Sequence, residues 1–126
     1  MSLNYVMLGS NDVAKARGFF GAVFPVIGGK LIAEYMPHAF CYQLRGGERV
    51  WIATPHNKET AKVGNGNMVG PECQSKGEVQ EAHWIGLANG GTNEGDPGPR
   101  PLYGPDFYGA YLRDLDGNKM SFVFVG

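Results

Sequence analysis

The chain has few side chains whose types and spacing could bind a metal or carry out catalysis. We expect His38 in a turn between strands, His56 at the start of a polar loop and His83 in a helix. Around His83, Gln80 and Gly86 provide no second ligand at helical spacing. Each histidine is therefore predicted to be a surface or capping residue rather than a metal ligand.

The cysteines and carboxylates also lack a catalytic pattern. Cys41 and Cys73 form no Cys-x-x-Cys pair and cannot build a disulfide framework, so we interpret both as buried thiols on strands. No Ser-His-Asp, Cys-His or paired-carboxylate arrangement follows from the spacing. Nothing distinguishes Glu72 or Asp106 as an acid or a base.

Composition limits the possible classes of protein. The 126 residues predict a single domain, and the formal net charge of −1 offers no electrostatic surface for nucleic acid or an anionic membrane. The apolar runs are too short to span a bilayer, and residues 1–5 lack the basic start and apolar stretch of a signal peptide. We therefore expect a cytoplasmic protein.

The first half of the chain predicts a strand, a helix and three strands. Residues 3–8 are apolar up to Gly9, and residues 10–12 offer helix N-cap chemistry. Apolar residues at helical spacing follow as far as Pro25. Further strands are expected at 30–36, 39–45 and 49–54, before a polar loop at 55–67.

The second half repeats this order. We expect a strand at 67–74, although Pro71 removes a hydrogen-bond donor from it, and then a helix whose capping box is Ser75 and Glu78. Residues 92–105 are rich in Gly and Pro and are predicted to form a long irregular connection. The last strands are expected at 107–113 and 119–125, joined by a turn at 114–118.

The doubled order predicts an α+β fold in which two modules, at about 1–60 and 66–126, make one domain. Each module would have one sheet face covered by its helix. Two modules side by side would leave a cleft over their uncovered faces, where a small ligand could bind.

Two motifs resemble the glyoxalase/bleomycin-resistance/dioxygenase superfamily, and the resemblance extends over nearly the whole chain. One is the opening Val-x-Leu-Gly-Ser-Asn-Asp at 6–12, and the other is the terminal run 103–119 with its Asp-Leu-Asp-Gly-Asn turn. In the turn, Leu115 stands where Pro is usual in the family. The resemblance implies paired βαβββ modules, with curled mixed sheets around a ligand cleft, and a homodimer.

Metal-dependent relatives hold a divalent ion with four side chains on cleft-facing strand positions. Carried onto this chain, those positions fall at Tyr5, about Ile52, Met68 and Ser121. A phenol, an aliphatic side chain, a thioether and a hydroxyl are poor ligands for such an ion. We therefore predict no metal and no other cofactor.

Side-chain alternation predicts the lining of the cleft. Tyr5 and Met7 share one face of the first strand, and Met68 and Ser121 would join them. Four aromatic residues could contribute further, depending on register: Tyr42, Trp51, Tyr108 and Tyr111.

The leading functional hypothesis is a metal-free protein that binds a small molecule with an apolar or aromatic body. The alternatives are a lactoylglutathione lyase-like enzyme that acts on a small oxo compound or a glutathione conjugate, and a metal-free enzyme that uses Tyr5 or a carboxylate as acid or base. A further alternative is a dimerisation module whose cleft is filled by Tyr5, Met7 and Met68.

Overall fold

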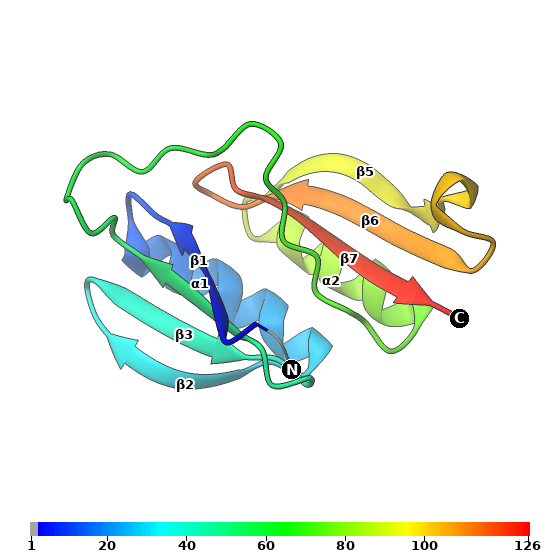
Figure 1. Cartoon of the computed structure of the whole chain (residues 1–126), viewed down its shortest axis with the longest axis horizontal. Coiled ribbons are helices and arrows are strands. Elements are labelled where there is room, and N and C mark those ends of the chain that lie inside the picture. Colours follow the sequence, from blue (N-terminus) through cyan, green and yellow to red (C-terminus); the bar gives the residue numbers. More distant parts are fainter. Residues whose placement is uncertain (1–2) are drawn as a thin grey trace.

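The order of strand, helix and strands occurs twice in the computed structural model, which describes residues 3–126 (Figure 1). The first half contains β1 (Tyr5–Gly9), α1 (Val13–Val23), the 3-10 helix η1 (Phe24–Ile27), β2 (Lys30–Tyr35), β3 (Ala39–Gln43) and β4 (Arg49–Ala53). The second half contains α2 (Lys76–Ala88), β5 (Thr92–Pro99), the 3-10 helix η2 (Pro101–Tyr103), β6 (Phe107–Arg113) and β7 (Lys119–Val125). The predicted α+β class with two βαβββ-like modules is confirmed.

Each helix begins at the capping residue that the sequence indicates. The Asp12 side chain accepts a hydrogen bond from the backbone N–H of Lys15, and Ser75 accepts one from that of Glu78. Helix α1 passes directly into η1, which ends at Gly28 in the left-handed conformation. An N-cap hydrogen bond satisfies one of the backbone donors that a helix start leaves unpaired.

Two sheets carry the strands. The first has the order β1-β4-β3-β2 and is mixed, because β1 runs parallel to β4 while the other neighbours are antiparallel. The second has the order β5-β6-β7 and is antiparallel. Residues 69–72 run beside β7 through parallel bridges, and so occupy in the second module the place that β1 has in the first.

The strand predicted at 67–74 is therefore present only as isolated bridges. Val69 donates its N–H to Lys119 and Cys73 donates to Val123, but Pro71 between them has no N–H to donate. The missing ladder bond explains why this segment does not form a continuous strand.

The prediction of an irregular connection at 92–105 was wrong. Residues Thr92–Pro99 form β5, and Pro101–Tyr103 form η2. Strand β5 pairs only with β6 and shifts register twice around Gly95. An edge strand tolerates Pro97 and Pro99 because only one of its sides needs backbone donors for the ladder.

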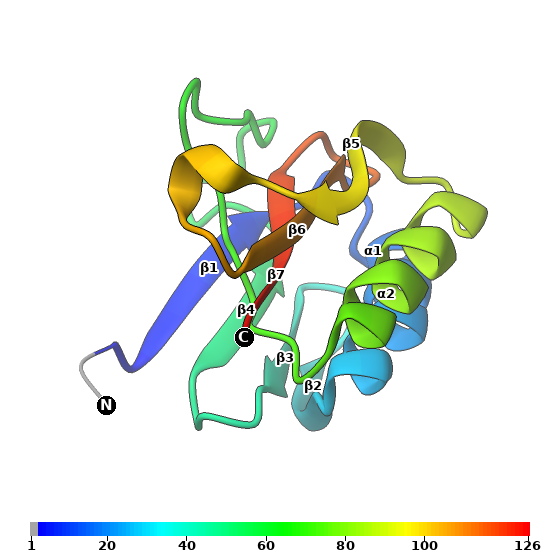
Figure 2. The same cartoon turned by 90° about the vertical axis from the view of Figure 1, so that its right-hand side faces the viewer.

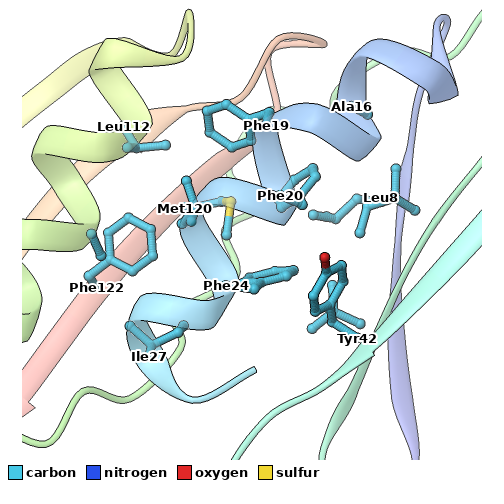
Figure 3. Close-up of a cluster of buried hydrophobic side chains, with 14 of the residues drawn as sticks. Leu8, Ala16, Phe19, Phe20, Phe24, Ile27, Tyr42, Leu112, Met120 and Phe122 are labelled. Atoms are coloured by element: carbon cyan, nitrogen blue, oxygen red, sulfur yellow. The ribbon is translucent and has the colours of Figure 1, made fainter. Parts of the chain in front are cut away.

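Both helices lie on the same side of both sheets, and Figure 2 shows them next to each other there. The layer between helices and strands is a single apolar core that draws on both modules (Figure 3). Its fully buried large side chains include Phe19, Phe20, Phe24, Phe40, Met120 and Phe122. No helix in the described part of the chain has the length and apolar character needed to cross a membrane.

The turn between β6 and β7 joins the two modules. The Asn118 side-chain amide donates to the carbonyl of Gly9 and to the Asp114 carboxylate, both at 2.9 Å. Asp116 accepts a hydrogen bond of 2.8 Å from the backbone of Asn11. Burial raises the pKa of Asp114, while hydrogen bonds from Asn118 and Asp116 act in the opposite direction. The Asp-Leu-Asp-Gly-Asn run is therefore a clamp between modules, as well as a turn.

Candidate functional site

The sheet faces that point away from the helices carry most of the residues predicted to line a cleft. On β1, Tyr5 is 54% exposed and Met7 is 55% exposed, whereas the alternating Leu8 is buried. On β4, Trp51 is paired with Met7 and stacks on Tyr35 with ring centroids 6.1 Å apart. Tyr5, Met7 and Trp51 thus share the helix-free face of the first sheet.

Two predicted cleft residues lie on the opposite face. Tyr42 is buried against Phe24, with ring centroids 5.2 Å apart, and its hydroxyl accepts a hydrogen bond from Arg17 (Figure 3). The Tyr108 hydroxyl accepts a hydrogen bond of 2.8 Å from Gln80 on α2. Alternation along β3 and β6 turns both side chains toward the helices, so neither belongs to the cleft.

The histidine predictions hold for two of the three residues. His38 and His56 are exposed in turns, as expected. His83 is buried rather than at the surface, with Nε2 at 3.1 Å from Asn93 Oδ1 and 3.2 Å from the carbonyl oxygen of Tyr111. Because both contacts of Nε2 are acceptor oxygens, this nitrogen donates to the second sheet and ties α2 to it.

Both cysteines are buried, as predicted, but only Cys41 lies on a strand, β3; Cys73 follows the isolated bridge at Glu72. Burial raises the pKa of Cys73 to about 12, and burial also raises that of Cys41. Because the thiolate is the nucleophilic form, neither residue is suited to covalent catalysis at neutral pH.

The helix-free face of the second sheet holds an open pocket of about 660 Å³, which we call the Tyr111 pocket. Tyr111 is paired with Gly95 on one side and with Ser121 on the other, and these residues form a row across the sheet. The pocket is lined by Met68, Glu94, Gly95, Arg100, Tyr103, Phe107, Tyr111, Lys119 and Ser121.

Glycines create the space in this row. A Cβ atom at Gly95 would lie 2.9 Å from the Tyr111 ring, and one at Gly70 would lie 2.7 Å from Ser121 Oγ. A Cβ atom at Gly98 would lie 3.2 Å from the Arg100 guanidinium. Larger residues at these positions would displace the side chains that form the pocket.

Two cationic groups flank the Tyr111 ring. The Arg100 guanidinium carbon lies 5.4 Å from the ring centroid, and Lys119 Nζ lies 5.8 Å from it. Arg100 donates hydrogen bonds to the carbonyls of Asp96 and Pro99, at 2.7 and 3.3 Å. Within residues 3–126, neither cation forms an ion pair.

A second pocket, of about 360 Å³, lies where the two modules meet. Tyr5 from β1 and Met68 from the segment beside β7 both line it. Met68 also lines the Tyr111 pocket, so the two spaces adjoin at this residue. The structure thus brings Tyr5, Met68, Tyr111 and Ser121 to neighbouring pockets, whereas Met7 and Trp51 line neither of these two.

The residues present do not fit a divalent ion at the position that the resemblance implies. Ile52 is fully buried on the helix side of β4, so Trp51 is the residue on the helix-free face there. Tyr5, Met68 and Ser121 offer a phenol, a thioether and a hydroxyl, which do not form a ligand set for a hard or borderline ion. Across residues 3–126, no three His, Cys, Asp or Glu side chains are grouped so that they could hold a metal ion.

Sequence reasoning did not include Arg100 and Lys119 among the site residues. Side-chain alternation on β7 places Lys119, two residues before Ser121, on the same face as Ser121. The sequence pattern therefore predicts the position of Lys119. Arg100 follows β5, and it could not be assigned while 92–105 was interpreted as irregular.

Comparison with solved structures identifies the family. A glyoxalase/bleomycin resistance protein from Albidiferax ferrireducens T118 is 34% identical, with a TM-score of 0.88 over 100% of both chains. The chain belongs to the glyoxalase/bleomycin resistance/dioxygenase superfamily. More distant superfamily structures share its fold alone. A glyoxalase-related enzyme from Fulvimarina pelagi has 20% identity and a TM-score of 0.79 over 98% of this chain and 88% of its own.

The fosfomycin resistance protein FosX from Listeria monocytogenes has the same superfamily fold. It is 17% identical, with a TM-score of 0.74 over 100% of this chain and 94% of its own. No curated protein and no family model matches the sequence.

Proposed function

We propose that this superfamily member binds a small organic molecule in the Tyr111 pocket without the help of a divalent ion. The observation that carries the proposal is the row of Gly95, Tyr111 and Ser121, in which a glycine opens space beside an aromatic ring and a hydroxyl. An aromatic ring and a few polar groups in a concave site are typical of small-molecule pockets.

The donor chemistry supports a metal-independent mode of binding. In a metal site the ion would polarise an oxygen of the ligand, and that role requires imidazole or carboxylate ligands on the facing strands. Tyr5, Met68 and Ser121 stand at those positions instead. The lactoylglutathione lyase-like alternative depends on such an ion, and no contact in the structure favours it.

The alternative of a filled cleft is also disfavoured. Tyr5, Met7 and Met68 are each about half exposed, at 54, 55 and 49%. If these side chains filled the cleft as ordinary core, they would be shielded like Phe40 or Phe122, both of which are fully buried.

We further propose a homodimer in which a second copy covers the helix-free face of the first sheet. Tyr5, Met7 and Tyr35 expose apolar surface on that face, and exposed apolar patches of this kind commonly mark interfaces. Met7→Glu should then convert a dimer to a monomer in sedimentation analysis, while the matched change Met36→Glu in the β2–β3 turn should not. A wild-type monomer at micromolar concentration would contradict this part of the proposal.

The test of metal independence is elemental analysis of the purified, tag-free protein, with a thermal-shift titration of nickel, zinc, manganese and iron(II). We expect no stoichiometric metal and no stabilisation by any of these ions. A screen of aromatic and apolar compounds in excess chelator should then yield stabilising ligands, because a ligand that binds only the native state raises the melting temperature. A stoichiometric metal, or ligand binding that chelator abolishes, would contradict the proposal.

A further inference from the structure

The charges around the Tyr111 pocket point to the class of ligand. We infer that the pocket binds a small aromatic carboxylate, whose negative group is held by Arg100, Lys119 and Ser121. This inference rests on the proposed function and specifies the chemistry of the same pocket.

The balance of charge in the pocket favours an anion. Its lining contains Arg100, Lys119 and one carboxylate, Glu94. Glu94 is already paired with Arg113, with 3.0 Å between Oε1 and Nε. Within residues 3–126, Arg100 and Lys119 therefore have no carboxylate partner. Each can form a charge-assisted hydrogen bond, one of the stronger kinds, with the carboxylate of a ligand.

Arg100 is held in place before any ligand binds. Its guanidinium lies across β5, donates to the carbonyls of Asp96 and Pro99, and occupies the space that side chains at Gly95 and Gly98 would need. An arginine that is already ordered loses less conformational entropy on binding than a free one. Gly95 and Gly98 thus leave the space in which the Arg100 guanidinium lies.

Ser121 supplies a neutral donor at the base of the pocket. The residue is only 3% exposed, it lines the pocket, and no hydrogen bond joins its hydroxyl to another side chain or carbonyl in residues 3–126. Because no fully shielded side-chain oxygen in residues 3–126 lacks a hydrogen-bond partner, this hydroxyl still contacts the pocket, where a carboxylate oxygen can accept its hydrogen bond.

The remaining walls suit a flat apolar body. Phe107 and Tyr103 meet edge to face with ring centroids 5.4 Å apart, and Met68 also belongs to the lining. Thioether and aromatic surfaces together favour an aromatic ring over an aliphatic chain. One anionic group attached to one aromatic body therefore matches both parts of the pocket.

The experiment compares three probes of nearly the same shape by isothermal titration at pH 7 in excess chelator: 2-naphthoate, 2-naphthamide and 2-naphthylmethylamine. We expect naphthoate to bind at least about tenfold more tightly than the amide, since one charge-assisted hydrogen bond is sufficient for that difference. The amine should bind most weakly.

Variants then identify the groups responsible. Lys119→Gln and Arg100→Gln should each weaken naphthoate binding about tenfold and weaken amide binding much less. Lys119→Arg should retain most of the affinity. Lys62→Gln is the matched control, because Lys62 is exposed in the loop after β4 and does not line the pocket.

Equal binding of naphthoate and amide would overturn the inference and leave the proposed pocket intact. The same conclusion would follow if the charge variants had no effect. If no naphthyl probe bound but the compound screen gave other ligands, the ligand class would be wrong while the proposed function stood. If neither the probes nor the screen gave a ligand, both proposals would fall.

Discussion

The helix-free faces of the two sheets come from modules with the same order of elements, yet they carry different side chains. The first sheet presents mainly apolar or aromatic side chains, Tyr5, Met7 and Trp51, with Arg49 beside Tyr5 at the start of β4. The second presents Lys119 and Ser121 beside Tyr111, with Arg100 lying over the same ring. In both modules the strand residues that face the helices form the core, which keeps the two halves alike. The alternating residues on the helix-free faces are not part of this core and can differ between the modules. One face suits a covering partner and the other suits a polar ligand.

The largest expected effect tests whether the two modules share one core. Phe20→Ala in the first module and Phe122→Ala in the second should each lower the free energy of unfolding by about 3–5 kcal/mol, because both rings are fully buried in the same cluster. Met7→Ala on the helix-free face should cost less than about 0.5 kcal/mol in the monomer. Urea unfolding monitored by circular dichroism measures all three.

A different ranking would change the comparison. If Phe122→Ala were much milder than Phe20→Ala, the modules would have separate stabilities. A cost of Met7→Ala that appears only at high protein concentration would instead support the proposed cover of the first face by a second copy.

An intermediate effect is expected at the clamp between modules. Asn118→Ala removes the amide that donates to Gly9 and Asp114, and it leaves acceptors unpaired in a partly buried site. We expect a loss of about 1–3 kcal/mol in the free energy of unfolding. Asn57→Ala, in the exposed loop after β4, is the control and should have little effect. An Asn118 variant as stable as the wild type would show that the modules do not depend on this clamp.

The smallest effect concerns the ion pair between Arg45 and Glu78, which joins the β3–β4 hairpin to the start of α2. Its hydrogen bonds, the shortest of 2.6 Å, lower the pKa of Glu78 below its ordinary value. A carboxylate with a depressed pKa stabilises the folded state above the unfolded pKa, near 4.3, and loses that contribution as the pH falls through the folded value.

Glu78→Gln should therefore cost about 0.5–1 kcal/mol at pH 7, since the pair is partly exposed, and less at pH 3, where the Glu78 carboxylate begins to be protonated. Unfolding by urea at the two pH values measures the difference. Glu81→Gln, an exposed change on the same helix, should show no such dependence on pH. A constant deficit for Glu78→Gln would mean that helix capping, rather than charge, is the source of the effect.

Periodicity in the sequence was enough to predict the repeat, both helices and the faces of β1 and β7, because local hydrogen bonding and burial impose these patterns. It failed at 92–105, where pairing with β6 outweighs the low strand propensity of Gly and Pro. It also left open the register of β3 and β6, so Tyr42 and Tyr108 were placed on the wrong side. The sequence alone does not predict Arg100 as a site residue, because its position depends on the path of β5.

The most direct test of the central claim is a methyl spectrum of protein labelled at methionine, titrated with 2-naphthoate in excess chelator. Met68 lines the Tyr111 pocket, Met7 lies on the other helix-free face and Met120 is buried in the core. We predict a saturable shift of the Met68 signal, with the Met7 and Met120 signals unchanged. Because Met68 also lines the second pocket, the shift should be weakened by Lys119→Gln, a change that affects the Tyr111 pocket alone of the two. A shift confined to Met7, or a Met68 shift that appears only when a divalent metal is added, would contradict metal-independent binding in the Tyr111 pocket.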